Sequence, residues 1–481
     1  MLFGVAFAQA LCAGAGFAFE WGVDELDEHT VADVAGLSVA AVLTGAIGAF
    51  LFLYGKRFAR ETLTRREAVL AVALIWLMAG ISGGIPFVAA GDLSPVDAFF
   101  ESVSGMTTTG ATVIGHIERD LSRPILLWRS LIQWLGGMGI VVLFVAIFPS
   151  VGAGAKHMFK GEVPGTSAEG LKPRIAETSF TLWKLYAGFT AIEAVLLYLL
   201  GMTPFEAVCH ALTTMSTGGF STSDASIGGW DSFSIEMVVA TFMLLGSINY
   251  GLYYALLRGR SVRATLRNTE LRAFVVLCAI FTLVLTVGIL PQHDHDLIQS
   301  FRYAYFMVGT TMSSTGYGTD DYMAYSQPML FVVVLMMFIG GCSGSTAGGI
   351  KVERIILMAK TSWAEFRESF RPAVVQVVKM GRVAVPKEIL QDVAVLIGVY
   401  MACLGAGCLF VVITDDVSIG TAFGATLSCL SNMGPAPWHD GPDNFAAYSQ
   451  GAKVFFVLAM LLGRLEFFTL FALLVPDFWK R

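Results

Sequence analysis

The sequence predicts an all-α polytopic membrane protein built from four similar units, each with a span, a shorter helix, a glycine turn and a second span. Three observations lead to this prediction: the composition, ten long apolar stretches, and a turn pattern that recurs four times. Hydrophobic residues make up 55% of the 481 residues and charged residues 14%, with a mean hydropathy of +0.68. Soluble domains average about 45–50% apolar and about 25% charged residues. A soluble globule is therefore excluded, and a net charge of -6 without a free basic tract excludes a nucleic-acid binder.

Ten stretches are long and apolar enough to cross a bilayer core of about 30 Å, which needs about 20 helical residues. None shows the alternating pattern of a barrel strand. The first stretch lacks the positive region of a cleaved signal peptide and is expected to remain as a span. The stretches lie near 3–19, 33–54, 68–90, 125–149, 180–202, 233–257, 271–290, 328–350, 388–413 and 452–475.

Lysine and arginine are concentrated in alternate loops, and this asymmetry predicts the orientation of the chain. The densest basic groups lie at 56–66, 156–174, 258–272 and 351–387, whereas the opposite loops are mainly acidic. Because basic loops stay on the cytoplasmic side, both termini are expected to be cytoplasmic. The basic segments 156–174 and 351–387 either only signal this topology or also dock a cytosolic partner. The exceptions on the acidic side are Arg119, Arg123, Arg129 and Arg302.

A shorter apolar segment follows four of the outward-running spans, near 95–109, 204–218, 296–315 and 417–433. Such a segment cannot cross the membrane, because ten to fifteen helical residues reach only about 15–22 Å. Each ends in a turn with glycine at the fifth place, and the turns recur roughly every hundred residues, as repeated structural units do. The turns are Met106-Thr107-Thr108-Thr109-Gly110, Met215-Ser216-Thr217-Gly218-Gly219, Met312-Ser313-Ser314-Thr315-Gly316 and Leu430-Ser431-Asn432-Met433-Gly434.

Backbone that leaves helical geometry at membrane depth is tolerable only inside protein or beside water. Four such turns around one axis would form rings of carbonyl oxygens that replace the hydration shell of a cation, as in potassium filters. Glycine reaches the required backbone angles, and serine and threonine hydroxyls offer further oxygen ligands. The sequence therefore predicts a filter formed by Thr109, Gly110, Gly218, Gly219, Thr315, Gly316, Asn432, Met433 and Gly434, with potassium held at Thr109, Gly110, Thr217, Gly219, Thr315, Gly316, Met433 and Gly434.

The third turn is the most similar to a known filter. Thr315-Gly316-Tyr317-Gly318 is close to the Thr-Val-Gly-Tyr-Gly segment of potassium channels, whereas the other three turns have one glycine in register. Four unlike segments should present fewer well-matched carbonyl layers than a fourfold channel. Selectivity for potassium over sodium is therefore expected to be real but less strict.

Two features lie on the chain where a gate would be needed. The stretch 340–349 interrupts the eighth span with five glycines, and it indicates either close packing of small residues or a flexible intramembrane loop that gates the pore. Arg464 stands in an otherwise apolar span, which by default indicates function, although an ion pair with Glu466 or another acidic residue is the alternative. The candidate gate residues are Gly340, Gly341, Ser343, Gly344, Gly348, Gly349 and Arg464.

The four turns, the stretch 340–351 and the closing Pro-Asp-Phe-Trp at 476–479 resemble the TrkH subunit of bacterial Trk potassium uptake systems. The wider superfamily includes the Ktr and HKT transporters, and the resemblance covers nearly the whole chain. It implies four membrane–pore–membrane repeats around one potassium-channel-like pore with pseudo-fourfold symmetry, plus two extra N-terminal spans. The implied divisions are 1–60 for the extra spans, then repeats at 61–155, 175–258, 268–362 and 385–481. Pro435, after the fourth glycine, departs from the commonest turn of the family.

The resemblance also implies partners and a mode of gating. A homodimer in the lipid bilayer of the bacterial inner membrane is expected, together with a cytoplasmic nucleotide-binding regulator of the TrkA type. The nucleotide would act only through that regulator, and no covalent cofactor is expected. Arg464 matches an arginine below the filter, where its charge would hinder cation passage when the gate is closed. The expected function is potassium uptake, with a sodium- or proton-coupled carrier on the same fold as the alternative.

Other motifs do not support an enzyme. The segment 344–351 nearly matches a phosphate-binding loop, but Ile350 separates Gly349 from Lys351 and no strand precedes it. Gly341-Cys342-Ser343-Gly344 resembles a serine-protease turn, yet only His210 offers a base and it precedes a pore turn. His293 and His295 indicate either an outer metal site or a solvated loop. Glu101 and Glu206 either attract cations to the outer mouth or serve in packing.

Overall fold

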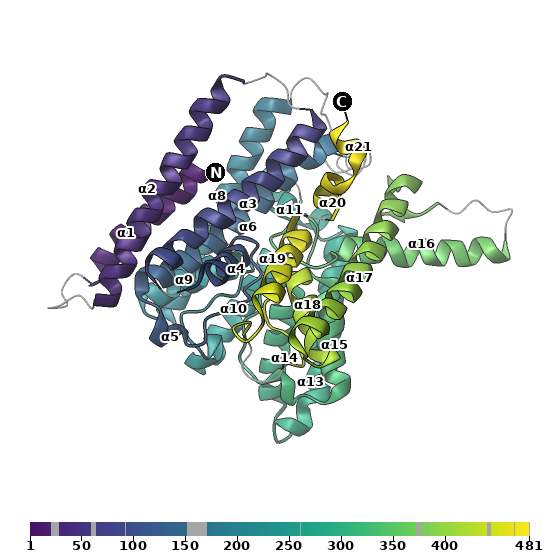
Figure 1. The fold of residues 1–481 in the computed structure, drawn as a ribbon. Helices are drawn as coiled ribbons and strands as arrows, with labels where there is room; N and C mark the ends of the chain where they lie inside the picture. Colours follow the sequence, from purple (N-terminus) through teal and green to yellow (C-terminus); the bar gives the residue numbers. More distant parts are fainter. Residues whose placement is uncertain are drawn as a thin grey trace.

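The computed structural model describes residues 1–20, 28–58, 64–91, 93–151, 171–259, 261–371, 377–381, 383–439, 444–465 and 467–480. These residues are almost entirely α-helical (Figure 1), which confirms the predicted fold class. The strands described are β1 (Lys379–Met380) and β2 (Val383–Ala384), a short antiparallel hairpin. The helices of nineteen residues or more are α1 (Leu2–Glu20), α2 (Glu28–Lys56), α3 (Arg65–Ala89), α6 (Arg123–Val151), α8 (Leu171–Leu199), α13 (Thr269–Ile289), α16 (Val352–Phe370) and α17 (Lys387–Asp415).

The shorter helices fall between these long ones. They are α4 (Pro95–Met106), α5 (Ile117–Asp120), α9 (Pro204–Met215), α10 (Phe233–Gly246), α11 (Tyr250–Leu257), α12 (Val262–Thr265), α14 (Leu297–Met312), α15 (Gln327–Ile339), α18 (Ile419–Ser431), α19 (Gln450–Leu465), α20 (Phe467–Leu474) and α21 (Pro476–Trp479), with 3-10 helices η2 (Ser226–Trp230), η3 (Leu290–Gln292) and η4 (Tyr322–Ala324).

Five described helices, α2, α3, α8, α13 and α17, are long and apolar enough to cross a membrane. A sixth candidate consists of α10 and α11, bent by 86° at the break between them. The predicted stretches 3–19 and 125–149 correspond to α1 and α6. Within the apolar stretch 328–350 the helix α15 ends at Ile339 and Gly340 takes a φ of 69°, at the place where the glycines indicated an interruption. The stretch 452–475 corresponds to α19 and α20, and residue 466 lies outside the described residues.

The four short helices α4, α9, α14 and α18 occupy the positions predicted for the non-crossing segments. Each begins with a side chain that accepts a hydrogen bond from the first turn, which satisfies an otherwise unpaired N–H at the helix start. Each ends two or three residues before its predicted limit, because the turn residues leave helical geometry earlier than the sequence suggested. The capping residues are Ser94, Thr203, Asp296 and Ser418.

Helix packing places the four short helices in a closed cycle. Each packs against the span before it, in the pairs α3–α4, α8–α9, α13–α14 and α17–α18. Each also packs against the span that ends the preceding unit, in the pairs α6–α9, α10–α14 and α15–α18. The cycle is closed by α19, the last long apolar helix, which packs against α4 near the start of the chain.

The arginines that departed from the charge asymmetry have acidic partners. Arg129 contacts Glu101 at 2.7 Å, Arg302 contacts both Glu236 at 2.7 Å and Asp231 at 2.8 Å, and Arg119 contacts its neighbour Asp120 at 2.8 Å. These pairs neutralise three of the four exceptions. They therefore do not contradict the orientation predicted from the remaining basic residues.

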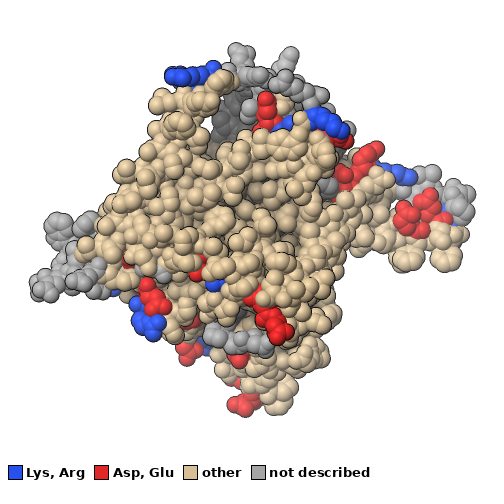
Figure 2. Space-filling view, in the orientation of Figure 1, with Lys and Arg blue, Asp and Glu red and all other residues tan. Residues whose placement is uncertain are grey.

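The surface has few charges over much of its area. In the face shown in Figure 2, most blue and red side chains lie toward the two ends of the molecule, with a broad uncharged region between them. Helix α16 projects sideways from the rest of the fold and leads into the β1–β2 hairpin before α17 (Figure 1). Helix α16, which carries part of the basic segment 351–387, thus lies largely outside the helical body.

Candidate ion-conduction pathway

The four glycine turns have one backbone conformation in common. The third residue of each turn is left-handed, with φ of 53° at Thr108, 54° at Thr217, 55° at Ser314 and 53° at Asn432. The glycine two places later is also left-handed, with φ of 82° at Gly110, 78° at Gly219, 90° at Gly316 and 95° at Gly434. Pro435 therefore does not change the local geometry of the fourth turn.

Hydrogen bonds from the turn to its own helix hold this conformation. The N–H of the fourth turn residue donates to a carbonyl five residues earlier: Thr109 to Ser104 at 2.8 Å, Gly218 to Thr213 at 2.9 Å, Thr315 to Thr310 at 2.9 Å and Met433 to Ser428 at 3.0 Å. This is the bond that closes a helix after a left-handed residue. The helices end by one mechanism in all four units, as the repeated sequence pattern predicted.

The turns meet around a common centre. A Cβ on each turn glycine would come within 3.0 Å of a carbonyl oxygen of the next turn: Gly110 faces Gly218, Gly219 faces Thr315, Gly316 faces Met433, and Gly434 faces Thr109. The order runs from the first turn to the fourth and back to the first. The nine residues predicted for the filter are thus brought together in one closed ring of backbone, where side chains at the glycines would not fit.

Asn432 ties the fourth turn to two other parts of the chain. Its side-chain nitrogen donates to the Thr109 hydroxyl at 2.9 Å and to the Met460 carbonyl at 2.9 Å. A Cβ on Gly463 of α19 would overlap the Leu430 carbonyl and lie 2.7 Å from the Asn432 side-chain oxygen. Helix α19 therefore packs directly on the fourth turn.

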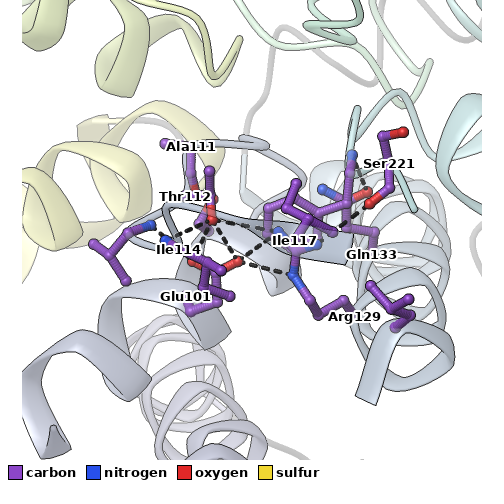
Figure 3. A network of polar contacts seen from close by, with 12 residues as sticks. Glu101, Ala111, Thr112, Ile114, Ile117, Arg129, Gln133 and Ser221 are labelled. Carbon is purple, nitrogen blue, oxygen red and sulfur yellow. Dashed lines mark hydrogen bonds and ion pairs between the residues drawn. The ribbon is translucent and has the colours of Figure 1, made fainter. Parts of the chain in front are cut away.

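A buried ion pair lies behind the first and second turns (Figure 3). Arg129 on α6 and Glu101 on α4 are 1% and 0% exposed, and two guanidinium nitrogens donate to one Glu101 oxygen at 3.0 and 2.7 Å. Glu101 also accepts from the Thr112 hydroxyl and from the Val113 N–H at 3.1 Å. Arg129 stacks on Phe220, 4.1 Å from the ring centre. The pair connects the segments that follow the first and second turns.

Different groups support the second and third turns. Gln133 on α6 donates to the Gly218 carbonyl at 2.7 Å and accepts from the Phe220 N–H at 3.1 Å, so one amide spans the second turn. The Tyr317 hydroxyl of the third turn contacts the Thr213 hydroxyl and donates to the His210 carbonyl at 3.3 Å. In the first and fourth turns Ser104 and Ser428 donate to carbonyls of their own turns, those of Ala111 and Gly434.

The segment between α15 and α16 contacts three of the four turns. The Thr346 hydroxyl contacts the Met215 carbonyl at 3.2 Å, the Gly348 N–H donates to the Ser314 hydroxyl at 2.5 Å, and the Gly349 N–H donates to the Ser431 carbonyl at 3.0 Å. A Cβ on Gly348 would overlap the Ser431 carbonyl. The segment is not helical and is closely packed on the turns, and the prediction that it gates the pore stays a prediction.

Arg464 reaches the same segment from α19. Its side chain is 4% exposed and donates to the Thr346 carbonyl at 2.6 Å. Its other two guanidinium nitrogens are buried without a hydrogen-bond partner among the described residues. The proposed alternative partner, Glu466, lies outside the described residues. The six glycine and serine candidates for the gate and Arg464 thus lie together below the ring.

The comparisons with known proteins agree with this geometry. The family model described as TrkH, a cation transport protein, matches residues 40–480. The chain belongs to the TrkH family. It is 38% identical to the Trk system potassium uptake protein TrkH of Halomonas elongata over 448 residues, 92% of each chain, and 38% identical to the protein of that name in Escherichia coli K12 over 445 residues, 90% of each. The crystal structure of the potassium transporter TrkH from Vibrio parahaemolyticus matches with a TM-score of 0.86 and 32% identity, covering 100% of this chain and 99% of that one.

Family membership and the apolar helices together make this TrkH-family chain a multi-pass membrane protein. The sequence left two roles open for Glu101 and Glu206, and the contacts of both residues favour one of them. Glu101 is fully buried and paired with Arg129, so it is not open to the outer solution. Glu206 accepts from the Thr203 N–H at 2.9 Å and so caps the start of α9. Both have the packing role that the sequence left open.

The histidines also have local roles in this TrkH-family chain. His293 lies 3.2 Å from Asp320 and is 12% exposed, so it is a paired, mostly buried side chain instead of a solvated one. Among the described residues no group of three or more His, Cys, Asp or Glu side chains is placed to hold a metal. His210 lies between the Glu206 carbonyl and the Ser221 hydroxyl, at 2.8 and 3.1 Å.

Sequence reasoning missed three side chains that matter in this TrkH-family site. Arg129 was noted only as an exception to the charge asymmetry, and Gln133 was not noted. Glu193 is an ionisable residue inside the predicted span 180–202, which is itself a signal of function that was not used.

Proposed function

We propose that this chain conducts potassium into the cell across the bacterial inner membrane through a filter made by the four turns. The closed ring of glycines, each facing a carbonyl of the next turn, is the observation that carries the proposal. Backbone oxygens converging from four sides can replace the water around a monovalent cation. The two relatives named above carry the description potassium uptake protein, which supports potassium as the transported ion.

A substitution at a ring glycine tests the filter. Gly219→Ser places a Cβ against the Thr315 carbonyl, so the second and third turns must separate. Purified protein in liposomes should then lose its preference for potassium and rubidium over sodium. Gly188→Ser on α8, where a Cβ meets no atom within 4 Å, is the matched control and should keep the preference. Unchanged ion discrimination in Gly219→Ser would contradict the filter.

Below the ring, we assign the gate to the segment 340–349 and Arg464. The segment contacts three turns and Arg464 donates to the Thr346 carbonyl, so a cation leaving the ring meets closely packed backbone and a positive charge. Shortening the segment should raise basal flux without changing ion preference. A rise in flux together with lost preference would place the segment in the filter and not in a gate.

The orientation and partners follow from the basic segments. Arg66 donates to the Lys480 carbonyl, which places the start of α3 beside the C-terminus; with basic loops on the cytoplasmic side, both termini lie in the cytoplasm. We propose a homodimer whose basic segments bind a cytoplasmic TrkA-type regulator, through which nucleotide acts. Copurification of a regulator should be lost when the lysines and arginines of 351–387 are neutralised.

A sodium- or proton-coupled carrier on the same fold is the alternative. In liposomes, a channel-like pathway gives potassium flux that follows the potassium gradient alone. Flux that requires a sodium or proton gradient would favour the coupled carrier.

A further inference from the structure

Glu193 on α8 is a buried carboxyl group outside the ring and the gate segment. Its side chain is 0% exposed, and neither carboxyl oxygen has a hydrogen-bond partner among the described residues. Helix α8 packs against α6, α9, α10 and α11, so the group is enclosed by protein. A carboxylate without compensation in such a place costs many kcal/mol, and the group normally takes a proton instead.

The side chains around Glu193 are neutral hydroxyl groups. Thr214 on α9 lies close enough to interact with the carboxyl, and Tyr250 on α11 and Tyr317 after the third turn are within electrostatic range. The hydroxyls of Thr214 and Tyr250 are themselves buried without a hydrogen-bond partner among the described residues. The site is thus a small polar group of donors and acceptors enclosed behind the second turn.

The charged groups on the packed elements are occupied elsewhere. Arg129 on α6 pairs with Glu101, and Glu236 on α10 pairs with Arg302. His210 on α9 contacts the Glu206 carbonyl and the Ser221 hydroxyl. Tyr186, on α8 itself, donates to the Trp134 carbonyl at 3.1 Å. Arg464, which faces Tyr186, is bound to the Thr346 carbonyl. No ion pair to Glu193 is formed within the described part of the chain.

We propose that Glu193 is a proton-binding site and that its bound proton maintains the second turn in the conducting geometry. The proton comes from water and converts the carboxylate to the neutral acid. The connection to the turn is short, because the Thr214 carbonyl accepts from the Thr217 N–H at 2.9 Å and so holds its left-handed backbone. Loss of the proton leaves a negative charge beside Thr214, and α9 must move to let water reach it. This inference rests on the proposed ion conduction for only one of its two readouts, the ion flux.

Two measurements on the full chain in liposomes test the site. Infrared spectroscopy at neutral pH should show the carbonyl band of a protonated carboxyl that Glu193→Gln lacks and Glu388→Gln, at an exposed position of α17, retains. Raising the pH should remove this band, and rubidium flux should fall with it, by about tenfold per pH unit beyond the midpoint of a one-proton titration. Glu193→Gln, which imitates the neutral acid, should keep its flux over the same pH range.

A second variant separates a titrating site from a structural one. Thr214→Val replaces a neighbouring hydroxyl with a methyl group and so changes the polarity of the site, so loss of the band and loss of the flux should shift together along the pH axis. The proposal is overturned by absence of the neutral-acid band, by a band that persists with constant flux across the whole range, or by identical pH profiles in the wild type and Glu193→Gln. The infrared result does not depend on ion selectivity, so it tests this proposal even if the filter assignment fails. If Glu193→Gln does not fold, the shift in Thr214→Val decides.

Discussion

Removal of one partner of the Glu101–Arg129 pair should destabilise the protein more than removal of both. Both side chains are almost completely buried, and Arg129 supplies two hydrogen bonds, at 3.0 and 2.7 Å, to one carboxyl oxygen. Arg129→Met leaves Glu101 with only Thr112 and the Val113 N–H as donors. Breaking a buried pair by removing one partner costs about 3–5 kcal/mol.

The double variant Glu101→Met, Arg129→Met replaces both charges with apolar groups of similar length. Such replacements are often neutral, but here the Val113 N–H and the Thr112 hydroxyl lose their acceptor, at a cost of about 1–3 kcal/mol for the unpaired groups. The free energy of unfolding of the double variant should therefore lie closer to the wild-type value than that of Arg129→Met, by about 1–2 kcal/mol. Because the pair also connects the segments after two turns, Arg129→Met should lower potassium preference over sodium as well.

The assay is reversible unfolding in mixed detergent micelles, read from tryptophan fluorescence, with flux in liposomes measured on the same preparations. The wild type, the two single variants and the double variant form a double-mutant cycle, which gives the interaction energy of the two side chains. If the two single effects simply add in the double variant, the buried pair contributes no interaction energy and the reasoning is refuted.

Three further outcomes follow from the same contacts. Arg464→Ala should raise basal potassium flux severalfold in liposomes, since it removes the charge bound to the Thr346 carbonyl, and an unchanged flux would count against the gate. Gly463→Ala should weaken flux and stability because its Cβ overlaps the Leu430 carbonyl, whereas Gly405→Ala, in open space on α17, should leave flux unchanged and be slightly stabilising, by about 0.5–1 kcal/mol. Burial alone would raise the pKa of Asp97, but hydrogen bonds and charge from Lys453 outweigh it and lower the pKa below its ordinary value. The stabilisation from this pair is therefore complete above about pH 4 and lost as the pH falls through the lowered value, so the melting temperature should drop in acid for the wild type and less for Asp97→Asn.

The sequence was sufficient for features that depend on local chemistry. Hydropathy located the spans, and the turn pattern located all four short helices, because a left-handed residue followed by glycine specifies the same helix end wherever it occurs. The five glycines at 340–349 also indicated the interruption of the eighth span, and α15 does end at Ile339. Composition averaged over a window would not show such a break.

The supporting contacts behind the ring were not predictable in the same way. Arg129 and Glu101 are 28 residues apart, and Gln133 is 85 residues from Gly218. A single sequence gives no signal that these residues meet, so Arg129 was noted only as a misplaced basic residue and Glu101 was left with two possible roles, at the pore mouth or in packing. The bond from Asn432 to Thr109 spans 323 residues and depends on closure of the whole cycle.

The four turns share their backbone angles but not the groups that hold them. A serine on the same helix supports the first and fourth turns, a glutamine from α6 supports the second, and a tyrosine hydroxyl links the third to α9. An identical backbone with unequal supports implies that the four sides of the ring differ in stiffness. The second turn continues directly from α9, which packs against the helix that carries Glu193, so a change of charge at Glu193 acts first on this side of the ring. Selectivity in this chain should therefore be most sensitive to substitutions around α9, which is a property that a pore of four identical subunits does not have.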